Sequence, residues 1–125
     1  MKEKLLYLGV GMLFTHELDA MRNHEWLVLP LTSWLPSEYG EAVFIWTHIP
    51  LFAILVAALA SLNMKIRQNT RLGFSIFLVI HGILHAAFST HEKYEFASLT
   101  SNVLIFGGAI CGALYLLLNG RASRT

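Results

Sequence analysis

Four long apolar stretches, separated by short polar connections, account for most of the chain. Each stretch is close to the ~20 residues of helix that are needed to cross a hydrocarbon core of ~30 Å. Backbone groups inside a membrane must be satisfied within the segment, and a helix achieves this where a lone strand cannot. The pattern therefore predicts a single transmembrane domain over residues 1–125, an all-α four-helix up-down bundle. Its expected spans are residues 5–24, 41–63, 71–90 and 96–119.

The composition agrees with a membrane protein and excludes several other classes. Hydrophobic residues make up 55% of the chain and charged residues 14%, whereas about a quarter of the residues in a soluble domain are charged. The formal net charge of +1 excludes a basic nucleic-acid-binding protein, so no nucleic-acid partner is expected. The single cysteine, Cys111, excludes an internal disulfide framework.

The distribution of basic residues predicts the orientation in the membrane. All of the 9 lysines and arginines except Arg22 and Lys93 fall in connections or termini on one predicted side. Positively charged connections of membrane proteins face the cytoplasm. Both termini are therefore expected in the cytoplasm, with the two acidic connections on the outer side.

Histidines are the unusual feature of so apolar a chain, and they concentrate at one depth. Counting about 1.5 Å per residue from the cytoplasmic ends of three spans places His16, His48, His81 and His85 in a slab roughly 7 Å thick, just outside the bilayer midplane. His81 and His85 are four residues apart, so they share one face of a helix. Ionisable groups at this depth cost several kcal/mol, and we expect them to face the bundle interior and to find partners there.

Imidazole and carboxylate groups at one depth indicate a metal site in the outer half of the bilayer. Zinc and iron are the divalent ions that best accept this mixture of ligands. Asp19 or Glu25 would accept a ring N–H of a ligand histidine. With zinc, a bound water would be the nucleophile and Glu17 or Asp19 the catalytic base, whereas iron would suit oxidation. The candidate metal ligands are His16, Glu17, His48, His81 and His85.

Other functions remain open at this point. Two of the histidines could be axial ligands of a haem in an electron-transfer protein, or the cluster could be a hydrogen-bonded network that only holds the helices together. Intramembrane histidines and acids also occur in proton or metal relays, but the cytoplasmic halves of the spans are almost purely apolar, which favours a one-sided site. A structural subunit of a larger membrane complex is a further alternative.

Gly108 and Gly112 have GxxxG spacing in the last span. Small residues at this spacing allow two helices to approach closely, either within the bundle or across a homo-oligomer.

The runs THELDAMRNHEW, HIPLF and HGILHAAFSTHEKYEF resemble those of a family of short, four-helix bacterial membrane proteins of uncharacterised function. The resemblance implies that the histidine-bearing stretches belong together, and it supplies no reaction or ligand. We therefore expect a multi-pass protein of the bacterial inner (plasma) membrane that contacts lipid and binds a metal ion. A metal-dependent hydrolase or oxidoreductase acting on a lipidic or apolar substrate is the favoured function.

Overall fold

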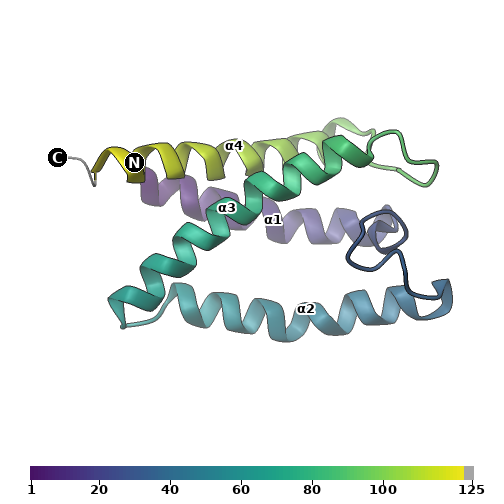
Figure 1. The fold of residues 1–125 in the computed structure, drawn as a ribbon, viewed down its shortest axis with the longest axis horizontal. Helices are drawn as coiled ribbons and strands as arrows, with labels where there is room; N and C mark the ends of the chain where they lie inside the picture. The colour runs from purple at the N-terminus through teal and green to yellow at the C-terminus, as the bar shows by residue number, and fades with distance from the viewer. Residues whose placement is uncertain (123–125) are drawn as a thin grey trace.

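The computed structural model describes residues 1–122, and its helices account for most of them. The prediction of an all-helical chain with four long helices is confirmed (Figure 1). A short 3₁₀-helix follows the first long helix. The elements are α1 (Lys2–Arg22), η1 (Glu25–Leu27), α2 (Ser37–Leu59), α3 (Met64–Phe88) and α4 (Leu99–Ala122).

Three of the helices, α2, α3 and α4, are long and apolar enough to cross a membrane. Helix α1 does not meet the same condition, although a first span was predicted over residues 5–24. The reason is its charged residues, which lie in the first turn and again near the C-terminal end, at Glu17, Asp19 and Arg22. The helices that fit a membrane protein are therefore α2, α3 and α4.

Local capping sets helix boundaries that hydropathy alone does not show. Helix α3 begins at Met64, seven residues before the expected start of the third span at residue 71. The Asn63 side chain accepts hydrogen bonds from the backbone N–H groups of Lys65 and Ile66, at 3.0 and 3.2 Å. An asparagine in this position satisfies donors that would otherwise lack partners at a helix start. The first turns of α3 are thus polar and precede its apolar stretch.

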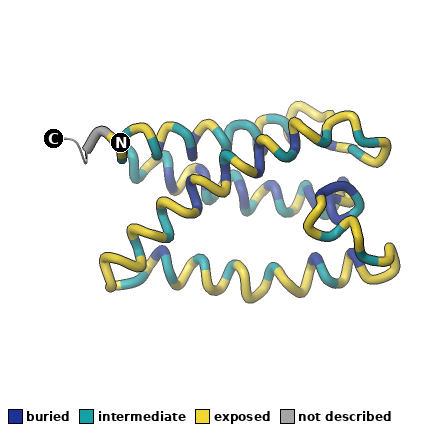
Figure 2. The backbone as a smooth tube through the Cα atoms, viewed as in Figure 1, coloured by how far each residue is buried: buried dark blue, intermediate teal, exposed yellow. Residues whose placement is uncertain are grey.

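Helices α1, α3 and α4 form the packed part of the molecule, and α2 stands apart from α1 (Figure 1). Figure 2 shows buried positions along the three packed helices and in the α1–α2 connection, whereas α2 is mostly exposed. The buried residues of α2 are Gly40, Phe44 and Leu59. The Lys2 ammonium donates to the side chain of Asn119 at 2.9 Å, so the first turn of α1 meets the last turns of α4.

Small residues allow α3 and α4 to approach closely. A Cβ added at Gly112 would lie 2.5 Å from the Ser75 carbonyl oxygen, and one added at Gly82 would lie 2.7 Å from the Cβ of Ala109. Gly108 also faces this side, because its added Cβ would contact Leu78 at 3.7 Å. The GxxxG face of α4 therefore packs inside the chain, against the helix that carries His81 and His85.

Candidate metal centre

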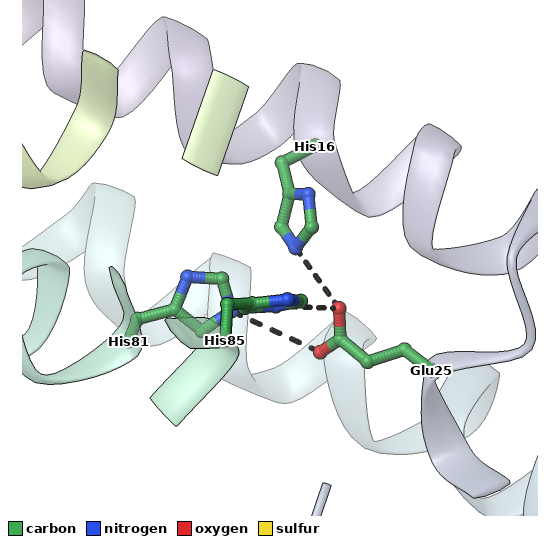
Figure 3. A group of neighbouring side chains, drawn as sticks. All are labelled: His16, Glu25, His81 and His85. Carbon is green, nitrogen blue, oxygen red and sulfur yellow. Dashed lines mark hydrogen bonds and ion pairs between the residues drawn. The ribbon is translucent and has the colours of Figure 1, made fainter. Parts of the chain in front are cut away.

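Three histidines and one glutamate meet in the interior of the packed helices. His16 comes from α1, Glu25 from η1, and His81 and His85 from α3. Figure 3 shows the three rings and the carboxylate pointing toward one another. Each of the four residues exposes 7% or less of its surface. One donor atom from each residue lies within 4.8 Å of the donors of the other three.

The distances in this cluster match the dimensions of a metal coordination sphere. Glu25 Oε2 lies 2.9 Å from His16 Nε2 and 3.4 Å from His85 Nε2, and Glu25 Oε1 lies 3.9 Å from His81 Nε2. Zinc binds nitrogen and carboxylate ligands at about 2.0–2.2 Å in a tetrahedron, so its ligand atoms lie roughly 3.3–3.6 Å from one another. The observed separations bracket that range.

The backbone between α1 and η1 brings Glu25 to this position. His24 has a φ of 51°, in the left-handed region, and it ends the helical course of the chain. In an uninterrupted helix, Glu25 would lie about 13.5 Å beyond His16 along the axis, out of reach of its ring. The reversal at His24 folds the carboxylate back onto α1 and α3.

Aromatic residues of the α3–α4 connection enclose the cluster from another side. The ring centroid of Phe96 lies 5.6 Å from that of His16 and 4.8 Å from that of His85. The Tyr94 hydroxyl lies 3.3 Å from His85 Nδ1 and contributes a polar partner for the outward nitrogen of that ring. Metal-binding histidines are commonly oriented by such a partner on the nitrogen that does not bind the metal.

Two observations indicate that the cluster suits a cation. His85 Nε2 is buried and has no hydrogen-bond partner among the described residues, although it points toward Glu25. A buried polar atom without a partner costs about 1–3 kcal/mol. Burial raises the pKa of the Glu25 carboxyl, but the surrounding imidazoles of His16, His81 and His85 outweigh this effect and hold that pKa well below its usual value. Glu25 is therefore an anionic ligand candidate at neutral pH.

The structure brings together three of the five predicted ligands, His16, His81 and His85. The other two, Glu17 and His48, form a separate contact between α1 and α2, in which His48 Nε2 lies 3.1 Å from Glu17 Oε2. His48 Nδ1 donates to the Phe44 carbonyl oxygen. Since that nitrogen carries a proton, the contact between Nε2 and the carboxylate requires a second proton on one of the two groups.

Glu25 is the residue of the cluster that the sequence assigned to a supporting position. Its carboxylate instead contacts all three histidines directly. The reason is that α1 ends at Arg22, whereas the first span was expected to continue to residue 24. The available signal was the Asn23-His24 pair, since both residue types are enriched in the left-handed conformation.

Asp19, which was predicted with Glu17 as the catalytic base, does not join the cluster. Its side chain is half-buried, and its Oδ2 is buried without a hydrogen-bond partner among the described residues. Its backbone carbonyl accepts from the Asn23 side chain at 2.9 Å and thus helps to end α1.

An open cleft of about 670 Å³ adjoins the cluster. Its walls are α1, α2, α3 and the α1–α2 connection, and most of its lining is apolar. Glu25 and His81 of the cluster reach this cleft, as do Glu17 and His48. Both groups of polar side chains can therefore be reached from the cleft beside α2.

Comparison with known proteins places the chain in a family without assigning it an activity. No curated protein and no solved structure matches it. The model of a family of unknown function (DUF6713) matches residues 2–122, which is almost the whole chain. This chain, with its buried histidine–glutamate cluster, therefore belongs to the family of unknown function DUF6713.

Proposed function

We propose that this protein binds one divalent metal ion within the membrane and acts as a metalloenzyme on an apolar substrate. The observation that carries the proposal is the convergence of His16, Glu25, His81 and His85, all buried and with donor atoms within 4.8 Å. Three imidazoles and one carboxylate are ligands that zinc and iron both accept. His85 Nε2 makes no hydrogen bond with the described residues, and a cation at the cluster would bind its lone pair.

The number of ligands separates the two candidate ions. Four protein ligands complete the tetrahedron of zinc, which is the pattern of a structural site, whereas a catalytic zinc site keeps one position open. Iron accepts six ligands, so the same four residues would leave room for substrate or oxygen. We therefore favour oxidation by an iron centre over hydrolysis by zinc. A haem is less well supported, because its ring would have to separate histidines whose ring centroids lie 4.6–5.1 Å apart.

We also propose an up-down bundle in a bacterial inner membrane with both termini in the cytoplasm. The apolar character of α2, α3 and α4 supports a membrane location. The contact between Lys2 and Asn119 supports the placement of both ends of the bundle on one side. The concentration of lysines and arginines near those ends supports the cytoplasmic side.

The direct test is the metal content of protein purified in detergent without chelators or a metal column. Wild-type protein should carry close to one ion per chain, and element analysis would identify it as iron or zinc. The double variant His81→Ala/His85→Ala should lose the ion, because it removes both ligands from α3. His91→Ala is the control and should retain it, since His91 Nδ1 accepts a hydrogen bond from the backbone N–H of Lys93, outside the cluster.

Two results would overturn the proposal. If folded wild-type protein contains no ion and takes up none of the added Fe²⁺ or Zn²⁺, the cluster is a hydrogen-bonded network. If His91→Ala loses the ion as completely as the double variant does, the ligands are not those of the cluster.

A further inference from the structure

We infer that the cleft beside α2 binds a single-chain lipid amphiphile, with its alkyl chain along α3 and its polar end at His81 and Glu25. This inference rests on the proposed function for the reaction of that polar end, and it names the class of substrate.

The walls of the cleft indicate that its occupant comes from the membrane. Two of them are α2 and α3, which are both apolar enough to span a bilayer. Along α3 the lining from Thr70 to His81, where the polar end is placed, corresponds to about 16.5 Å of helix. One leaflet contributes about 15 Å of hydrocarbon, half of the bilayer core. The cleft is thus long enough for an extended alkyl chain.

The volume of the cleft is that of a small-molecule site. The cleft offers about 670 Å³, which lies within the range of such sites. A narrow, flexible alkyl chain fits a cleft of this volume.

The polar groups of the cleft lie at one level, which orients an amphiphile. His81 and Glu25 reach it from the cluster, and the His48–Glu17 contact reaches it from α1 and α2. The side of α3 toward its N-terminus presents Gly73, Phe74 and Phe77, and α2 presents Leu51, Phe52 and Leu55 opposite them. The Thr70 hydroxyl at that end already donates to the Ile66 carbonyl. The polar end of a ligand is therefore accommodated at His81, and its chain among these apolar side chains.

Gly73 offers a substitution that fills the cleft without disturbing the cluster. It lines the cleft, and an added Cβ would meet no atom within 4 Å. It precedes His81 by eight residues, about 12 Å of helix, so a phenylalanine there would not contact the metal ligands. Gly11 is the matched control, because it is also an exposed helical glycine with no atom within 4 Å of an added Cβ, but it does not line the cleft.

The experiment is photolabelling of the full-length, metal-containing protein in detergent with octadecanol that carries a diazirine in mid-chain. Labelled peptides should map to the cleft sides of α2 and α3, and excess unlabelled octadecanol should compete. Gly73→Phe should lower the labelling by about tenfold, equivalent to about 1.4 kcal/mol of binding free energy, and Gly11→Phe should leave it unchanged. Octadecanoic acid and a two-chain phosphatidylcholine serve as separate competitors.

Competition by octadecanol or octadecanoic acid supports the inference and tells which polar end binds better. The inference is overturned if labelling is not competed and covers lipid-facing positions such as Ile54 and Ile80, which are 69% and 50% exposed. It is also overturned if only the phospholipid competes. Metal content measured on the same samples separates the two proposals, since bound metal without specific labelling refutes the cleft alone, and specific labelling without metal refutes the metal centre alone.

Discussion

At the scale of single residues, Glu25 is the central residue of the site. Its two carboxylate oxygens face a histidine of α1 and two histidines of α3. A buried carboxylate is costly unless opposite charge or hydrogen-bond donors surround it. Here His16 Nε2 lies within hydrogen-bond distance of the carboxylate, at 2.9 Å, and a bound cation would supply the opposite charge. The sequence identified the three histidines, and the contact geometry adds the acid.

Removing the charge of Glu25 should weaken metal binding more than removing that of Glu17. Glutamine keeps the shape of the side chain but not its charge, so Glu25→Gln is expected to lower metal affinity by at least about 10–100-fold, the range found for groups that only orient metal ligands. Glu17→Gln is the matched control, because Glu17 contacts His48 outside the cluster. Competition with a chromophoric chelator measures both affinities. A larger loss of metal affinity in Glu17→Gln would mean that the predicted ligand Glu17 binds the metal and that Glu25 does not.

At the scale of secondary-structure elements, the end of α1 determines the position of Glu25. His24 adopts a φ of 51°, and the turn that follows returns the chain to the bundle as η1. The conformation costs about 1–2 kcal/mol for most residues, more for those branched at Cβ, and little for asparagine or glycine. The backbone at residue 24 therefore controls whether Glu25 reaches the histidines.

Substitutions at His24 should separate its backbone conformation from its imidazole. His24→Asn keeps a residue type that tolerates the left-handed region, and it should retain the metal ion although it loses the exposed contact with Glu95. His24→Val disfavours that conformation and should reduce metal content while the helix content stays the same. Element analysis and circular dichroism on the two proteins check this. Loss of metal in His24→Asn would show that the ring itself is needed.

At the scale of the whole molecule, the arrangement of helices determines where the cluster is open to a ligand. Helices α1, α3 and α4 pack around the histidines, while α2 stands apart and leaves the cleft between itself and α3 (Figure 1). The first turn of α1 meets the last turns of α4, where Lys2 contacts Asn119. The site therefore opens into the apolar cleft beside α2. The start of α1 and the end of α4 lie at the same end of the molecule.

Reporter fusions should find both termini in the cytoplasm. Green fluorescent protein at either end is expected to fluoresce, and alkaline phosphatase fused after residue 35 is expected to be active, because the α1–α2 connection lies at the opposite end of the bundle. Termini on different sides of the membrane would contradict the up-down bundle. Termini that are both outside would reverse only the orientation that the basic residues predict.

The sequence by itself determined the properties that depend on neighbouring residues. Hydropathy and helical periodicity act over a few turns, so they indicated the four helices, their apolar character and the shared face of His81 and His85. They also placed His16 at the depth of that pair. These features need no knowledge of how the helices pack.

Only the tertiary structure decided which acid faces the histidines and where a ligand could enter. The position of Glu25 depends on His24, whose left-handed backbone changes the direction of the chain. Local periodicity in the sequence does not indicate such a change. The pairing of His48 with Glu17 depends on the distance between α1 and α2. These two helices are not closely packed along most of their length. Hydropathy is the same for a helix that faces lipid and one that borders a cleft, so the space beside α2 could emerge only from the packed molecule.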